Sequence, residues 1–341
     1  MKKIPEAKQL PSGNWFIRLR IKGSNGEQQS IPITRPTKAE CEREAAAIKY
    51  GIKEAQPRGA DKTLSQAIDD YIDARRNTLS PSTIAGYKRI QKTRFPSVMN
   101  RRLKDISGWQ RLCDLEARKY SPKTVRNSYR FIVSVLTENG ISPERVTLPA
   151  AQTNTRKWLD PEEIKTLVSS VAGTPNELYV FFALHSLRRS EIVAMRWENI
   201  DLDRRTITVK GAAVYDEDGN VVFKKENKNA ASARTIPIMI PEMEAALFAA
   251  KKPKGLVFNC SLKAVHERIN RACRDAGLEE VGTHGLRHSF ASLAYHLGMS
   301  EMETMEIGGW ADTSTMRKIY THLAAVDRLK AENKLRTFFN T

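Results

Sequence analysis

The first segment of the chain alternates between apolar and polar residues. Across residues 13–34 this alternation predicts a strand, a turn at the SNG triplet and a return strand. The apolar positions of the first strand are Trp15, Ile17, Leu19 and Ile21. Residues 37–52 then predict a helix with Thr37 as its N-cap, because a threonine oxygen can accept from the unpaired N–H groups of the first turn. Residues 1–58 therefore predict a small sheet backed by one helix.

The pattern changes to a helical period in residues 63–148. Two helix starts in this region share a Ser-Pro pair, one in LSPSTIAGYKRI (79–90) and one in YSPKTVRNSYRFI (120–132). Ser80 and Ser121 are the expected N-caps, and the proline that follows each is favoured at the first helical position, where no N–H is needed. This region therefore predicts an all-helical domain.

A third region begins with the sequence WLDPEE. Asp160 and Glu163 form a capping-box pattern around a proline at the first helical position. Further elements are expected as helices at 176–184 and 189–196, strands at 205–210, 221–225 and 233–238, and a hairpin turn at 216–220 between the first two strands. Helices are expected to fill the remainder of the chain.

The sequence thus predicts a multidomain, mainly α protein with small β-sheets, of the α+β class. The expected domains are a sheet-plus-helix unit at 1–58, a helical unit at 62–148 and an α+β unit at 157–341. Linker-like composition at 55–62 and 147–157 separates them.

Charge is distributed unevenly along the 341 residues. The net charge is +17, and residues 1–150 carry +14 of it. Such an excess of lysine and arginine favours a polyanionic partner, most often nucleic acid. A soluble basic protein without such a partner is the alternative.

Other classes of protein fit the sequence poorly. No apolar run reaches the length of about 18 residues that a membrane span needs, and no hydrophobic leader follows the start, so neither membrane insertion nor secretion is expected. The four cysteines lie far apart without a CxxC pair, which argues against a zinc site or a disulfide framework and fits a reducing cytoplasm. No phosphate-binding glycine motif for nucleotides occurs.

Two of the predicted helices carry basic faces. The basic residues are Lys88, Arg89 and Lys92 on the first, and Lys123, Arg126 and Arg130 on the second. One basic face is usually only solvated, but two in a basic helical domain favour contacts with DNA phosphates.

The segment THGLRHSF, residues 283–290, combines basic and apolar residues at helical spacing. His284, Arg287 and His288 fall on neighbouring rows of one face. The opposite face carries Leu286, Phe290 and Leu293. The segment is therefore expected to be a helix that is buried on one side and polar on the other, with the polar side either solvated or able to bind an anion.

Four stretches of the third region together form a larger pattern. They are SLRRSEI (186–192), KNAASARTIPI (228–238), THGLRHSF (283–290) and GGWADTSTMRKIYTHL (308–323). In this order and spacing the chain resembles the tyrosine recombinases, or phage-type integrases. The family pattern is an arginine turn, a lysine before a strand, H-x-x-R, a His or Trp after glycine, and a tyrosine about nine or ten residues later.

The resemblance implies roles for particular residues. It implies catalytic roles for Arg188, Lys228, His284, Arg287, Trp310 and the nucleophile Tyr320, with Glu191 in support. Lys224 and Lys225 are alternatives to Lys228 as the general acid. Two departures from the family are Ser186, where glycine is usual, and a Trp310–Tyr320 spacing that is one residue longer than the commonest. His288 lies outside the motif and is expected to be structural.

The resemblance also implies a reaction and partners. The tyrosine would attack a DNA phosphodiester to form a 3′-phosphotyrosine and a free 5′-hydroxyl, with no metal or other cofactor. The implied setting is a phage or other mobile element, whose integrase recombines double-stranded attachment sites in a bacterial cytoplasm, associated with the nucleoid. It would act as a homo-tetramer on DNA, with accessory DNA-bending or directionality proteins of the host or the element as further partners, and with no membrane. The first two domains would then bind arm and core DNA.

Two alternative functions and one question about the packing of the tail remain open at this point. A type IB topoisomerase has a similar site, and a DNA-binding regulator with a lapsed site needs no chemistry. The apolar residues of the tail, such as Val326, Leu329 and Phe338, would pack on their own domain or on a neighbouring protomer.

Overall fold

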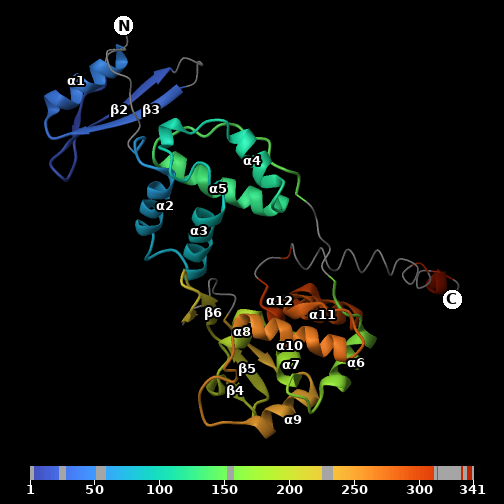
Figure 1. The fold of residues 1–341 in the computed structure, drawn as a ribbon. Helices are drawn as coiled ribbons and strands as arrows, with labels where there is room; N and C mark the ends of the chain where they lie inside the picture. The colour runs from blue at the N-terminus through green and yellow to red at the C-terminus, as the bar shows by residue number, and fades with distance from the viewer. Residues whose placement is uncertain are drawn as a thin grey trace. The chain divides into compact units, whose positions relative to one another are not determined.

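A computed structural model provides the structure of the chain (Figure 1). The residues that it describes are 4–22, 28–50, 59–151, 157–224, 233–310, 313, 332 and 336–339. Two compact units share the chain, one formed by 1–79 with 86–152 and the other by 80–85 with 153–341. Within the described residues, no helix combines the length and the apolar character needed to cross a bilayer.

The N-terminal segment forms the predicted sheet and helix. Strands β1 (Lys8–Gln9), β2 (Trp15–Lys22) and β3 (Gln28–Arg35) pair antiparallel in that order, and α1 (Lys38–Lys49) packs against β2 and β3. Ile17 lies opposite Ile33 in the register, and both are buried beneath α1 together with Cys41. The Thr37 side chain accepts from the N–H of Glu40, which confirms the predicted N-cap. The predicted SNG turn, residues 24–26, lies outside the described residues.

The next segment is all-helical, as predicted. Its elements are α2 (Leu64–Asp73), α3 (Pro81–Thr93), a 3-10 turn (Leu103–Asp105), α4 (Trp109–Ala117) and α5 (Pro122–Glu138). Ser80 and Ser121 accept from backbone N–H groups of their helices, so both predicted caps are confirmed. Residues 59–62 differ from the expected linker, because Leu103 donates to the Lys62 carbonyl at 2.9 Å and so joins this segment to the helices.

The C-terminal unit contains two small sheets that lie beside a group of helices (Figure 1). Its helices are α6 (Pro161–Val171), α7 (Glu177–Leu184), α8 (Arg189–Val193), a 3-10 turn (Trp197–Asn199), α9 (Pro241–Ala250), α10 (Leu262–Asp275), α11 (Gly282–His296) and α12 (Glu301–Gly308). Its strands are β4 (Ile200–Asp201), β5 (Thr206–Val209), β6 (Ala212–Tyr215), β7 (Val221–Lys224) and β8 (Arg234–Pro237). Asp160 and Glu163 form the predicted capping box at the start of α6.

The strand pairing differs from the expected hairpin. The turn at 216–220 joins β7 to β6, a strand that was not predicted. These two strands form a sheet of their own. β5 instead lies between β4 and β8. The physical reason is that Gly211, at a φ of 72°, turns the chain between β5 and β6 and ends the first strand there.

Helix α11 is more buried than its sequence pattern predicts. Arg287 was expected on a polar face, either solvated or able to bind an anion, but it is buried, as Leu286 of the apolar face is. Small residues at positions 285, 289, 291 and 292 let neighbouring elements approach closely, and α6, α7, α10 and α12 all pack against this helix. The prediction of a one-sided amphipathic helix was therefore wrong, and α11 is a central element of the unit.

Candidate functional site

The turn between α7 and α8 orients Arg188. Ser186 is buried in this turn with a φ of 65°, a left-handed conformation that explains why glycine suits the position. Arg188 then begins α8, and its N–H donates to Glu191 Oε2 at 2.9 Å while its Nη1 donates to Oε1 at 2.7 Å. Glu191 therefore fixes both the backbone and the guanidinium of Arg188, which agrees with its predicted supporting role.

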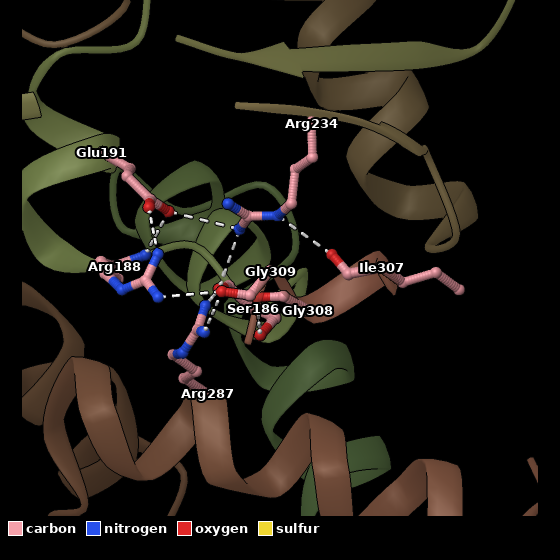
Figure 2. A network of polar contacts seen from close by, with 8 residues as sticks. All are labelled: Ser186, Arg188, Glu191, Arg234, Arg287, Ile307, Gly308 and Gly309. Atoms are coloured by element: carbon pink, nitrogen blue, oxygen red, sulfur yellow. Dashed lines mark hydrogen bonds and ion pairs between the residues drawn. The ribbon is translucent and has the colours of Figure 1, made fainter. Parts of the chain in front are cut away.

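Arg287 meets Arg188 from the other side of the unit, although the two residues lie 99 positions apart in sequence. Figure 2 shows both guanidiniums directed towards the turn that follows α12. Arg287 Nη2 donates to the Gly309 carbonyl at 3.3 Å, and Arg188 Nη2 donates to the same oxygen at 2.9 Å. Arg287 Nη1 also donates to the Ser186 carbonyl. The two predicted arginines thus converge on one shared backbone acceptor, the Gly309 carbonyl.

A third arginine belongs to the same network, and the sequence analysis gave it no role. Arg234 begins β8 and donates from Nη2 to Glu191 Oε2 and to the Ser186 carbonyl, each at 3.3 Å. Its Nε donates to the Ile307 carbonyl at 3.1 Å. The sequence does carry a signal for it, because Arg234 and the fully buried Ile236 are two residues apart and so share one face of the strand.

Trp310 packs on the arginine cluster. Its ring centroid lies 4.1 Å from the Arg287 Cζ, a cation–π contact, and 6.2 Å from the ring of Phe290 in a stacked arrangement. Gly308 makes room for this ring, since a Cβ at that position would lie 1.7 Å from Trp310. The tryptophan thus lies beside the arginines as the resemblance implies.

Burial and charge act together on these groups. Burial alone would raise the pKa of Glu191, but the guanidinium of Arg234, followed by Arg188, outweighs it and lowers that pKa. Burial, followed by the charge of Arg188, lowers the pKa of Arg287 well below its ordinary value. Burial also lowers the pKa of Arg234, although Glu191 opposes this. Arginine remains protonated in proteins, so three guanidiniums share one carboxylate and leave positive charge that an anion can compensate.

The remaining predicted catalytic residues are less fully described. His284 is exposed in the first turn of α11, one turn before the buried Arg287. Lys228, Lys225 and Tyr320 lie outside the described residues. Lys224 ends β7 and is half-buried. Among the described residues, no cluster of His, Cys, Asp and Glu side chains could hold a metal ion.

The predicted DNA-binding residues divide into two groups. Lys88 pairs with Asp69 at 2.6 Å, and Arg126 donates to the Pro149 carbonyl at 3.2 Å, so both already bond within the helical domain. The exposed members are Arg89, Lys92, Lys123 and Arg130. An exposed basic side chain needs no internal bond broken before it contacts phosphate, so these four fit that role better.

Comparison with known proteins identifies related chains. Residues 157–326 match the Phage integrase family. The integrase of Salmonella phage P22 is 27% identical over 204 residues, which span 58% of this chain and 51% of that integrase. Tyrosine recombinase XerD of Neisseria meningitidis serogroup B is 28% identical over 281 residues, 75% of this chain and 91% of that protein. The chain thus spans about half of the phage relative and most of the bacterial one.

Solved structures share the fold. The Tn1549 transposon integrase, in complex with transposon right end DNA, aligns with a TM-score of 0.61 and 16% identity over 80% of this chain and 98% of that one. A lambda integrase dimer bound to a core site aligns with a TM-score of 0.54 and 15% identity over 94% and 96%. These likenesses confirm the expected multidomain, mainly helical architecture with small sheets.

Proposed function

We propose that this chain, which belongs to the phage integrase family of tyrosine recombinases, is a site-specific recombinase that cuts and rejoins DNA strands. The observation that carries the proposal is the convergence of Arg188 and Arg287 from separate elements onto one backbone acceptor, the Gly309 carbonyl. Planar guanidiniums match the non-bridging oxygens of a phosphodiester, and their charge is only partly neutralised by Glu191.

In the proposed reaction the two guanidiniums bind the scissile phosphate. Charge builds on the non-bridging oxygens as the phosphorus is attacked, so preorganised donors stabilise the transition state more than the ground state. The phenolic oxygen of Tyr320 forms the new bond to phosphorus, and the bond from phosphorus to the 5′ oxygen breaks. His284 assists proton transfer from the phenol, and Lys228 supplies the proton that leaves with the 5′-hydroxyl. Reversal with a new 5′-hydroxyl reseals the DNA.

The partners follow from the charge distribution and the relatives. The basic first half binds double-stranded attachment sites, with the sheet-plus-helix domain on arm DNA and the helical domain on core DNA. The family relatives from a phage and the Tn1549 transposon support a mobile-element origin. We further propose that the protein acts in the bacterial cytoplasm as a tetramer on DNA, with accessory DNA-bending proteins.

Covalent attachment to DNA tests this function directly. The wild-type protein, incubated with DNA that flanks its own gene, is expected to become linked to 3′ ends at discrete positions. Tyr320→Phe is expected to bind the same DNA without any adduct, because phenylalanine lacks the attacking oxygen. An adduct formed by Tyr320→Phe would refute the nucleophile. Relaxation of supercoils without site preference would favour a topoisomerase, and wild-type binding without cleavage would favour a regulator.

A further inference from the structure

Arg234 is buried much more deeply than Arg188. Its side chain is 6% exposed, whereas the Arg188 side chain is 33% exposed. Arg287 is buried to a similar degree, at 4%, but Arg234 pairs directly with the Glu191 carboxylate, so the charge of Arg234 is compensated inside the protein. Burial of a charged side chain is costly even when it is paired, and a paired charge is less available to a DNA phosphate, so the role of Arg234 should lie in the contacts that it makes within the protein.

The bonds of Arg234 join three elements that are far apart in sequence. Through Nε it holds the last turn of α12 at the Ile307 carbonyl. Through Nη2 it holds the α7–α8 turn at the Ser186 carbonyl and also the Glu191 carboxylate. These are the same two turns on which the guanidiniums of Arg188 and Arg287 rest (Figure 2).

Gly309, the residue before Trp310, lies directly against Arg234. Gly309 adopts a φ of 64°, and a Cβ there would lie 2.7 Å from Arg234 Nη1 and 2.8 Å from its Cζ. The guanidinium therefore packs directly on the Gly309 backbone, whose carbonyl accepts from Arg188 and Arg287. Trp310 follows at once, so a displacement of this turn would move the tryptophan and the shared acceptor together.

We infer that Arg234 is a positioning residue, which aligns Arg188 through Glu191 and holds the Gly308–Trp310 turn against Arg287, without touching DNA itself. This inference rests on the proposed function for its catalytic consequence. Arg234 also begins β8, six residues after Lys228 in the sequence, so it anchors one end of the segment that carries the candidate general acid.

Cleavage of modified DNA distinguishes a loss of guanidinium alignment from a non-specific loss of folding or activity. Arg234→Met keeps an unbranched apolar stem but removes the guanidinium, with its charge and the bonds to Ile307, Ser186 and Glu191. On a duplex carrying the mapped cleavage position, we expect single-turnover adduct formation to fall about 100-fold, the loss that a displacement of about 1 Å can cause. A methylphosphonate at that position removes one negative oxygen and relaxes the need for aligned guanidiniums, so there the deficit should shrink to about 10-fold or less. Arg188→Met should show the same pattern.

Two further variants sharpen this test. Arg234→Lys keeps the charge but cannot span three acceptors, so it should remain impaired. Arg274→Met removes another arginine–carboxylate pair, that with Glu280 on the surface, and should cleave both duplexes like wild type. Wild-type rates for Arg234→Met, equal losses on both duplexes, or full activity of Arg234→Lys would each overturn the inference.

A DNA-independent measurement keeps the inference testable if the proposed function fails. The chain contains five tryptophans, and ¹⁹F NMR of 5-fluorotryptophan-labelled full-length protein can identify the Trp310 signal by its loss in Trp310→Phe. Arg234→Met should shift that signal, whereas Arg274→Met should leave it in place. An unmoved Trp310 signal would overturn the positioning role, whereas absence of any wild-type adduct would overturn only the recombinase function.

Discussion

Substitution of Glu191 by glutamine tests how the arginine cluster is held together. The Glu191 side chain is 2% exposed, and its two oxygens accept from the Arg188 N–H, the Arg188 Nη1 and the Arg234 Nη2. Glutamine has the same shape but no charge, and its NH₂ would face a guanidinium donor. The variant therefore leaves the buried guanidiniums without a counter-ion, the circumstance in which loss of a buried pair is most costly.

The size of the effect follows from the exposure of each partner. Breaking a buried ion pair costs about 3–5 kcal/mol. Arg188 is partly exposed, so water screens its interaction with Glu191 and can solvate its guanidinium in the variant. Arg234 is enclosed, so water cannot replace the interaction that it loses. We therefore expect the lower end, about 3 kcal/mol of unfolding free energy, or about 6–12 °C in Tm for a unit of this size.

Urea unfolding followed by circular dichroism measures this loss, with two companion variants. Glu280→Gln removes the half-exposed partner of Arg274 and should cost under about 1 kcal/mol. Arg234→Met in the Glu191→Gln background removes one uncompensated charge and should restore part of the loss, so that the two substitutions are not additive. A loss below about 1 kcal/mol for Glu191→Gln, or strict additivity, would refute the reasoning.

Two other substitutions follow from the packing around the site. His185 is buried between the Phe181 carbonyl at 2.7 Å and the Met239 N–H at 2.8 Å, and burial lowers its pKa to about 4 from an ordinary 6.5. Below pH 6.5 the unfolded state therefore binds a proton at His185 that the folded state excludes. The contribution of the neutral His185 to the free energy of unfolding is thus complete above pH 6.5 and declines by about 3 kcal/mol as the pH falls towards 4. His185→Gln should lose this part of the pH dependence in urea unfolding between pH 7.5 and 4.5, and an unchanged slope would contradict it. Gly285→Ala places a Cβ 2.9 Å from the Lys157 carbonyl, so thermal melts should show a loss of about 1–3 kcal/mol. Its control, Gly86→Ala, lies in α3 with open space around it and should be stabilising by about 0.5–1 kcal/mol, so equal effects would contradict the steric argument.

Features that depend on neighbours in sequence could be predicted from the sequence. The caps at Thr37, Ser121 and Asp160 were found because each side chain bonds to a backbone group only three residues away. The alternation in β2 was likewise sufficient to identify the strand. Arg188, Glu191, Arg287 and Trp310 were grouped correctly because their spacing follows a family pattern, although geometry at such distances cannot be read from periodicity.

Features set by distant contacts were missed. The burial of Arg287 depends on four helices that pack around α11, and nothing in THGLRHSF shows their presence. The pairing of β5 with β8 rather than with β7 depends on a turn at Gly211 whose φ is a property of the folded chain. Arg234 was passed over because an arginine at the head of a strand is usually solvated. The assignments of Lys228 and Tyr320 remain predictions.

The way the arginines are anchored agrees with a site for a polyanion. The bonds that orient Arg188 and Arg287 at this site go mainly to the carbonyls of Ser186 and Gly309, and each of these residues has a left-handed backbone. A carbonyl orients a guanidinium without cancelling its charge, whereas a second carboxylate would have cancelled one more positive charge of the cluster. A structural role alone would favour full neutralisation, because buried excess charge lowers stability. Anchoring by neutral acceptors at these two turns is therefore best explained by a need to keep positive charge available for a phosphate.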